Sequence, residues 1–224
     1  MAVKITAGIE EYLEALFHLQ EAQNPISTKD LSQHLKIAAP SVTEMLKKLS
    51  DQKLVRYVPY RGVTLTKNGR KAAVALVRRH RLSERFLADM LGLPWEDLHE
   101  EACKFEHIIS EKVEQKLLEA LGNPKTCPHG NPIPSPIGEI EEETIQPLST
   151  LRARDSGIIT KVTNESADFL HYLTSLGLFP KVHIKVDEVA PFSGPILVRV
   201  GHATYALGRG VAAQIWVKRT KRTS

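Results

Sequence analysis

The sequence predicts a mainly α-helical chain that ends in an all-β domain, and three patterns lead to this fold class. Two short helical patterns separated by a tight turn are followed by alternating β-forming residues, which is the pattern of a winged helix-turn-helix. Two longer helical patterns come next and predict a helical domain. After a proline-rich stretch, short β-rich runs alternate with turns, which predicts a small β-barrel of SH3-like size.

Three helices are predicted within the first fifty residues. Apolar residues recur at helical spacing in residues 8–22, which predicts an amphipathic helix. Thr28 is a candidate cap for a second helix that runs through residue 35. Pro40 is tolerated in the first turn of the third helix, residues 39–50. The short turn between the second and third helices indicates a helix-turn-helix.

The segment "LVRYVPYRGVTLT", residues 54–66, predicts a two-stranded hairpin that turns at Arg61 and Gly62. A helix-turn-helix followed by such a hairpin forms a winged helix. Residues 1–92 also carry 15 Lys and Arg against 9 Asp and Glu, and a basic segment suits a polyanionic partner. Together these observations favour DNA binding.

Two longer helices are predicted in the middle of the chain. The first covers residues 67–91, and the second covers residues 96–121 and stops at Gly122. The proline-rich residues 122–150 are expected to form a connector rather than a packed element. Residues 93–150 carry 12 Asp and Glu against 4 Lys and Arg, a balance that suits cations.

From about residue 151 the chain alternates β-rich runs with turns. The runs "SGIITKV", "HIKVDEV", "ILVRV" and "AAQIWVKR" predict strands, and "ESADFLHYLTSLGL" predicts one short helix. No apolar run approaches the roughly 18–20 residues of a membrane span, and the N-terminus lacks a signal-peptide pattern, so we expect a cytoplasmic protein. With Cys103 and Cys127 as the only cysteines, a disulfide framework is not expected.

The helix predicted for residues 96–121 carries an unusual polar face. Leu98, Ala102, Phe105 and Ile109 fall within one narrow arc, and a second set falls on the opposite side: His99, Cys103, Glu106 and His107. Nitrogen, sulfur and carboxylate donors one helical turn apart are the ligands of a divalent transition-metal site. His80 and Glu84, at i and i+4 on the preceding helix, repeat these ligand types. The alternative is that both sets are solvated surface residues.

These motifs occur in a recognisable order. A winged helix, then "RRHRLSERFL", then "HEEACKFEHIISEKVE", then "HGNPIP" and a small β-domain closely resembles the diphtheria-toxin-repressor (DtxR) family of metal-dependent transcriptional repressors. The resemblance implies a winged-helix DNA-binding domain over residues 1–72 and a helical metal-binding and dimerisation domain over residues 73–140. It also implies a linker over residues 141–150 and an SH3-like (FeoA-like) domain over residues 151–224.

The resemblance further implies two metal sites. The primary site would take Glu11 from the first helix together with Cys103, Glu106 and His107. The ancillary site would take His80, Glu84, His99, Glu165 and Asp168, with His171 as a substitute for one of the last two. Glu11 is a hard ligand that favours Mn²⁺, whereas Cys103 is the softer ligand of the iron-sensing branch, so both Fe²⁺ and Mn²⁺ stay open. Zn²⁺, Co²⁺ or Ni²⁺ would bind in vitro.

The same resemblance places the recognition helix at "APSVTEMLKKL". Its DNA-facing residues, with one from the preceding helix and one from the hairpin tip, would be Thr28, Pro40, Ser41, Thr43, Glu44, Lys47, Lys48 and Arg61. Metal would act as corepressor by ordering a homodimer for a double-stranded operator that controls metal-homeostasis genes. Two alternatives are a metal-independent winged-helix regulator and a metallohydrolase. The hydrolase is disfavoured because the chain has no H-E-x-x-H motif and no Gly-rich phosphate loop.

Overall fold

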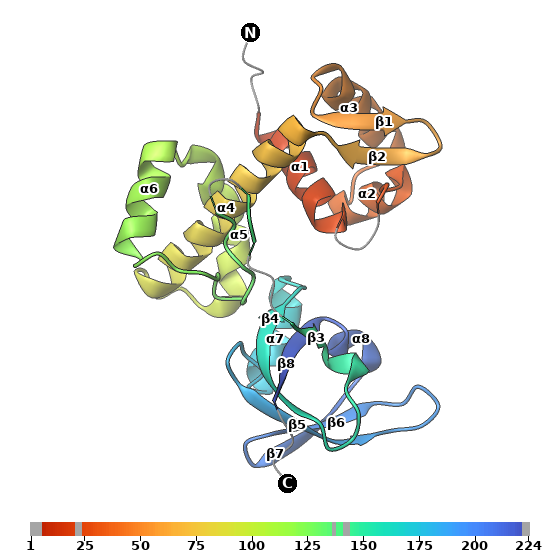
Figure 1. Ribbon diagram of the computed structural model, residues 1–224, viewed down its shortest axis with the longest axis vertical. Coiled ribbons are helices and arrows are strands. Elements are labelled where there is room, and N and C mark those ends of the chain that lie inside the picture. Colours follow the sequence, from red (N-terminus) through yellow and green to blue (C-terminus); the bar gives the residue numbers. More distant parts are fainter. Residues whose placement is uncertain (1–5, 21–23, 136–137, 141–143, 221–224) are drawn as a thin grey trace. The chain divides into compact units, whose positions relative to one another are not determined.

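The computed structural model describes residues 6–20, 24–135, 138–140 and 144–220 (Figure 1). These residues form two compact units, each described by itself here. The first unit comprises Met1–His80 with Pro134–Glu139, and the second comprises Arg81–Ile133 with Ile140–Ser224. Helix α4 (Lys67–Asp89) contributes its first part to one unit and its last part to the other. None of the described helices is long and apolar enough to cross a membrane.

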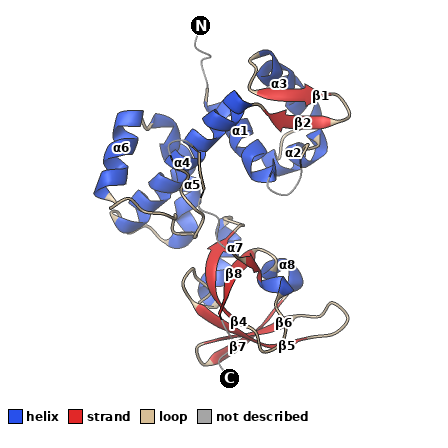
Figure 2. Ribbon diagram, in the orientation of Figure 1, coloured by secondary structure: helices blue, strands red, loops and turns tan. Residues whose placement is uncertain are grey.

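The first unit is a winged helix-turn-helix (Figure 2). Before α4 it contains α1 (Ala7–Gln20), α2 (Thr28–Leu35), α3 (Ala39–Asp51), β1 (Val55–Val58) and β2 (Gly62–Leu65). These elements form because each helix turns apolar residues inward at helical spacing. Leu13, Leu31 and Leu46 come from three different helices, and each is at most 1% exposed. The predicted elements are therefore observed, with ends that differ by at most two residues, and residues 21 and 22 of the first predicted helix lie outside the described residues.

One local prediction in this unit is wrong. The N-cap of α2 is Ser27 rather than Thr28, because the Ser27 hydroxyl accepts a hydrogen bond from the backbone N–H of Asp30 at 3.0 Å. Thr28 is the first helical residue. A serine and a threonine in succession both satisfy the cap preference, and only the backbone conformation decides between them.

The hairpin of β1 and β2 is fixed to the body of the first unit. Ile26 and Val63 exchange two backbone hydrogen bonds, at 3.0 and 2.9 Å, which attach β2 to the segment before α2. Gly62 lies in the left-handed region with φ of +106°, and a Cβ atom there would stand 2.5 Å from the carbonyl oxygen of Ile26. This wing therefore depends on glycine at one position for its close approach.

The second unit combines helices with a sheet. Its elements after α4 are the short 3-10 helices η1 (Trp95–Asp97), η2 (Glu106–Ile108) and η3 (Leu148–Thr150), the helices α5 (Leu98–Phe105), α6 (Glu111–Ala120), α7 (Ala167–Ser175) and α8 (Arg209–Ala212), and the strands β3 (Gln146–Pro147), β4 (Ser156–Val162), β5 (His183–Val189), β6 (Ile196–Val200), β7 (Ala203–Leu207) and β8 (Ile215–Thr220). The strands form one antiparallel sheet in the order β3-β8-β4-β5-β6-β7. Its core contains Ile159, Val186, Val198 and Val217, all 0% exposed.

The single helix predicted for residues 96–121 is broken into shorter pieces. Ile109 is extended, with ψ of 113°, and Ser110 caps α6 by accepting a hydrogen bond from the N–H of Val113. The apolar spacing continues across the break, so periodicity alone does not detect it. The cap residue followed by acidic Glu111 is the local signal for the new helix.

The described residues 122–135 of the proline-rich stretch do not form the connector that the sequence predicts, and residues 136, 137 and 141–143 of that stretch lie outside the described residues. Cys127 is 1% exposed, His129 is 0% and Asn131 is 7%, so this part of residues 122–150 is packed. Asn131 donates to the carbonyl of Val162 at 3.1 Å, and the N–H of Val162 donates to the carbonyl of His129 at 3.0 Å. The segment is thereby attached to the end of β4. Prolines here shape a buried loop instead of a free linker.

Candidate metal centre and DNA-binding surface

Ligand-type side chains gather around Glu84 of α4 and Glu165 of the loop before α7. Two sets share these carboxylates. His80 and His99 complete one set, and Cys127 and His129 complete the other; within each set the ligand atoms all lie within 4.8 Å of one another. Four of the five residues expected for the ancillary site are therefore brought together. Cys127 and His129 are an addition that the sequence interpretation missed.

The most buried contact in this region joins Glu84 and His129. Glu84 Oε1 lies 3.0 Å from His129 Nδ1, and both side chains are 0% exposed. The other ring nitrogen, Nε2, lies 3.1 Å from the backbone carbonyl oxygen of Trp95. A ring held from both sides by fixed partners has its orientation determined before any ligand binds.

Glu165 links the sheet domain to the helices. Asn131 Nδ2 donates to Glu165 Oε1 at 2.6 Å, and His99 Nδ1 of α5 lies 3.1 Å from Glu165 Oε2. Its Oε1 atom also lies 3.9 Å from His129 Nδ1. One carboxylate thus contacts side chains from α5 and from the buried loop, and a cation bound beside it would connect the same elements.

The pKa values of His129 and Cys127 in this cluster are both raised. Burial by itself lowers the pKa of His129, but the Glu84 carboxylate and the hydrogen bond with Cys127 outweigh burial and raise that pKa to about 11. Burial, followed by the Glu84 charge, raises the pKa of the Cys127 thiol to about 11. At neutral pH both groups hold their protons, so the imidazolium neutralises Glu84. A cation that took both as ligands would displace those protons.

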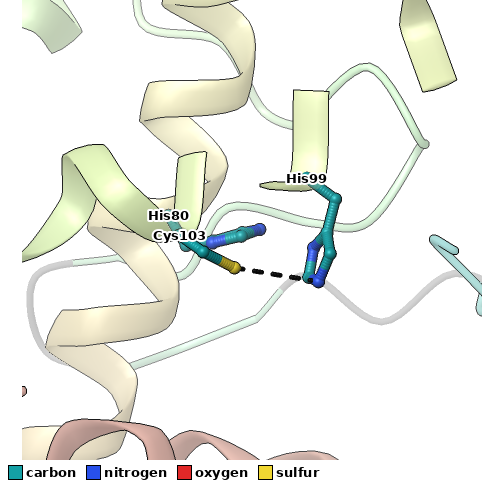
Figure 3. A group of neighbouring side chains, drawn as sticks. All are labelled: His80, His99 and Cys103. Carbon is teal, nitrogen blue, oxygen red and sulfur yellow. Dashed lines mark hydrogen bonds between the residues drawn. The ribbon is translucent and has the colours of Figure 1, made fainter. Parts of the chain in front are cut away.

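A second group of donors includes part of the C-x-x-E-H motif (Figure 3). The ligand atoms of His80, His99 and Cys103 lie within 4.8 Å of one another, and Cys103 Sγ is 3.8 Å from His99 Nε2. Cys103 is half-buried rather than fully on a solvated face. The nitrogen and sulfur donors therefore point toward one another, as a soft-ligand site requires.

The last two residues of the motif are not solvated either. Glu106 is 1% exposed, although its predicted place was on a polar face, and His107 Nε2 lies 3.7 Å from Glu106 Oε1. The shift to a 3-10 helix at Glu106 changes the direction of its side chain. A buried carboxylate requires a positive or hydrogen-bonding partner.

In the first unit, the first helix offers a different carboxylate from the predicted one. Glu11 is exposed on α1 and belongs to none of the ligand groups found among the described residues. Glu14, one turn later, is half-buried, and its carboxylate has an oxygen within 4.8 Å of a ring nitrogen of His80. Glu10 pairs with Arg79 at 2.9 Å, which holds α1 against α4 beside these two side chains.

The remaining predicted ligands lie apart from the cluster. Asp168 is exposed in the first turn of α7 and belongs to no ligand group among the residues that the structure describes. His171 has a side chain that is 77% exposed and lies 3.7 Å from Glu96. Neither joins Glu84. Cys127 and His129 lie beside Glu84 instead. Their C-x-H spacing before "GNP" is the only local signal for them in the sequence.

The predicted DNA-facing residues occupy one side of the helix-turn-helix. Val42, Leu46 and Leu49 turn the inner face of α3 into the core at 0% exposure. The outward residues of α3 and the wing are exposed: Pro40, Ser41, Glu44, Lys47, Lys48 and Arg61. Thr28 and Thr43 are half-buried, and the Thr43 hydroxyl donates to the carbonyl of Ala39 at 2.9 Å. A short helix with two exposed lysines suits the major groove of DNA.

A winged helix joined to a helical segment rich in histidine, cysteine and carboxylate ligands defines the class of metal-responsive DNA-binding regulators. Three family models match successive parts of the chain. They describe the N-terminal DNA-binding domain of iron-dependent repressors (residues 4–63), their metal-binding and dimerisation domain (residues 66–135) and the FeoA domain (residues 146–219).

Individual relatives extend over most of the chain. The iron-dependent repressor IdeR of Mycobacterium leprae is 32% identical over 223 residues, which cover 94% of this chain and 96% of the relative. The diphtheria toxin repressor of Corynebacterium glutamicum is 36% identical over 147 residues, 65% of this chain and 64% of its own. A solved manganese-dependent transcriptional repressor in complex with manganese has a TM-score of 0.88 and 34% identity, covering 96% of this chain and 100% of that one.

The chain therefore belongs to the iron-dependent repressor family, which includes the diphtheria toxin repressor. Its function is that of a metal-dependent, DNA-binding transcriptional repressor, and it is not an enzyme.

Proposed function

We propose that the chain is a cytoplasmic repressor that binds operator DNA as a homodimer when Fe²⁺ or Mn²⁺ is bound, and so represses metal-homeostasis genes. The observation that carries this proposal is the buried cluster around Glu84. A carboxylate that is 0% exposed, surrounded by histidine, cysteine and a second carboxylate, has the donor set of a transition-metal site. The relatives named for iron and for manganese support both metals.

For the ancillary site we propose two overlapping ligand sets. Glu84 and Glu165 belong to both, so one cation completes its shell either with His80 and His99 or with Cys127 and His129. The second set is the more buried one, because Cys127 and His129 are 1% and 0% exposed. We favour Cys127 and His129 for that reason. Asp168 stays outside both proposed sets.

For the primary site we propose Cys103, Glu106 and His107 with a carboxylate of α1. Glu14 is a stronger candidate than Glu11, since it is half-buried and lies near His80. The cation would supply the positive charge that lets a thiolate and several carboxylates lie together. Without it, these negative charges would repel one another, and this difference would connect metal binding to the position of the winged helix.

The homodimer contact would use exposed apolar side chains of the second unit. Met90 and Leu91, directly after α4, are 59% and 57% exposed, and Ile108 and Val113 are 74% and 46% exposed. Exposed apolar residues that gather on one segment mark an interaction surface. The matched dimerisation domain covers all four positions. A two-fold dimer would place its two recognition helices at the spacing of successive major grooves.

The experiment is metal-dependent DNA binding of matched variants. A labelled operator duplex is first selected from a random-sequence DNA pool on the Mn²⁺-loaded protein. Operator affinity is then measured for the wild type, Glu14→Gln and Glu11→Gln over a range of free Mn²⁺ and, anaerobically, free Fe²⁺. We expect Glu14→Gln to require at least about tenfold more metal, because a charged ligand is lost, and Glu11→Gln to behave as the wild type.

If Glu11→Gln required more metal than Glu14→Gln for operator binding, Glu11 would be the α1 ligand of the primary site. His129→Ala and His99→Ala form a matched pair, because each removes one ligand from a different ancillary set. The number of Mn²⁺ ions that each variant binds in calorimetric titration shows which set holds the ion. Equal operator affinity in chelator and in saturating metal would instead make the chain a metal-independent regulator.

A further inference from the structure

The β-sheet of the second unit has one packed face and one solvated face. Val186 of β5 is 0% exposed and lies in the core cluster that also contains Leu170 of α7 and Ala212 of α8. Its neighbour on β5, Lys185, is exposed. Because successive side chains of a strand point to opposite faces, α7 and α8 pack on the inner face of the sheet, and Lys185 belongs to the outer face.

The strand register aligns five polar residues in one row across this outer face. Thr220 of β8 is opposite Ser156 of β4, and Ser156 is opposite Lys185 of β5. Arg199 of β6 is opposite Lys185 on one side and Thr204 of β7 on the other. Directly opposite residues lie on the same face of a sheet. Each of the five side chains ends in a hydrogen-bond donor, either a hydroxyl or a cation, and we call these five residues the donor row.

The two cations of the donor row are placed at a cost to the sheet. Lys185 and Arg199 are directly opposite each other, and like charges in that position destabilise a sheet. Asp187 offsets part of the cost, since one of its oxygens lies 2.8 Å from Arg199 Nη2 and accepts from the Thr204 hydroxyl at 3.4 Å. The Arg199 side chain is nevertheless 54% exposed, and Lys185 forms no ion pair with any other described residue. Exposed cations that oppose each other suit a polyanionic ligand.

The dimensions and chemistry of the donor row fit the backbone of DNA. With about 4.8 Å between neighbouring strands, five residues in a row span roughly 19 Å. One DNA strand carries a phosphate about every 3.4 Å along the helix axis, so the row faces about five phosphates. Serine and threonine hydroxyls, lysine and arginine are all common phosphate contacts. In the adjacent row, Lys218 of β8 is also exposed, opposite Ile158 of β4, and adds a third cation to the same face.

We propose that the donor row is a second DNA contact, through which the outer face of the C-terminal sheet binds the phosphate backbone beside the operator core. This proposal rests on the operator binding proposed above. The contact reads no bases, because its groups are those that bind phosphate, so it adds affinity that is independent of sequence and falls steeply with salt. The winged helix then selects the site, and the sheet extends the length of DNA that each chain occupies.

The experiment compares the salt dependence of binding to two duplexes. Both contain the selected operator core, and one is extended on each side by about two helical turns, roughly 20 base pairs, of unrelated sequence. The affinity of full-length protein in saturating Mn²⁺ is measured over a range of KCl concentrations. Each phosphate contact contributes about 0.9 to the slope of log affinity against log salt. We expect the wild type to have a slope on the extended duplex that is steeper by at least about 2 than its slope on the core duplex.

Two variants that each remove one positive charge form a matched pair. Lys185→Gln should lower the slope on the extended duplex by about 2, one contact for each chain of the homodimer, and leave binding to the core duplex unchanged. Lys112→Gln, on the exposed surface of α6, should behave as the wild type on both duplexes. Circular dichroism should show that Lys185→Gln melts no lower than the wild type, since it removes one of two like charges that face each other.

Several results would overturn the role of the donor row. These are equal wild-type slopes on the two duplexes, an extended-duplex slope that Lys185→Gln leaves intact, or an equal loss of slope in Lys112→Gln. Retention of a polyglutamate peptide that Lys185→Gln abolishes, with DNA binding unaffected, would assign the face to an acidic protein instead. Failure of the metal-loaded wild type to bind even the core duplex would overturn the proposed function, and so is distinct from failure of the donor row alone.

Discussion

Replacing His129 by leucine removes the positive charge that faces the buried carboxylate of Glu84. Both side chains are 0% exposed and their nearest polar atoms are 3.0 Å apart, so the remaining carboxylate stays in a low-dielectric site. Loss of one partner of such a buried pair costs about 3–5 kcal/mol. At roughly 2–4 °C per kcal/mol for a chain of this size, the melting temperature of the second unit should fall by about 6–20 °C.

Tryptophan fluorescence measures this loss in the right part of the molecule. Trp95 and Trp216 are the only tryptophans and both lie in the second unit, so their emission follows its unfolding alone. The Trp95 ring also lies 5.3 Å from the His129 ring, between centroids. The protein is kept in chelator at pH 7.5, where His129 carries its proton.

Two further variants separate the ion pair from general damage. His171→Leu, on the exposed surface of α7, should change stability by less than about 0.5 kcal/mol. In the double variant Glu84→Leu with His129→Leu, most of the loss should be recovered, since two apolar side chains replace the buried charges. A single His129→Leu variant within about 1 kcal/mol of the wild type would refute the account of this pair.

Three other perturbations have defined outcomes. Raising the pH of the chelated protein from 8 to 10 should lower the melting temperature followed by tryptophan fluorescence. In the folded protein His129 and Cys127 each have a pKa of about 11, whereas in the unfolded chain their pKa values are near 6.5 and 9.0. The folded state therefore binds more protons in this pH range and loses stability as the pH rises. Gly130→Ala would place a Cβ atom 1.9 Å from a β4 carbonyl oxygen, so calorimetry should show weakened Mn²⁺ binding at the ancillary site. Gly62→Ala would clash with Ile26 at 2.5 Å, so operator affinity should fall at least about tenfold while calorimetric Mn²⁺ binding is unchanged.

The sequence predicts the first unit well because its elements are local. The helices are amphipathic, and the hairpin turns at a residue pair that needs glycine, so periodicity and turn chemistry are sufficient. The break at Ile109 was missed because apolar residues stay in phase on both sides of it, and only Ser110 indicates a new start. Elements with a regular pattern are thus predictable, and interruptions within such a pattern are not.

The residues of the candidate metal centre are likewise predicted only in part. His80 and Glu84 were found because they lie one turn apart on a regular helix. Cys127 and His129 were missed because a proline-rich loop has no periodicity, and its burial depends on contacts with Val162, more than thirty residues later. The choice between Glu11 and Glu14 likewise depends on which side of α1 faces α4, and this direction is a tertiary property.

The central claim is that metal controls DNA binding, and one titration tests it most directly. Fluorescence anisotropy of the labelled operator duplex is measured with wild-type protein in chelator and then at rising free Mn²⁺ or, anaerobically, Fe²⁺. The account predicts that at least one of the two metals raises operator affinity by tenfold or more, in step with occupancy of the sites by calorimetry. Operator binding that is equally tight in chelator and in saturating metal would contradict it.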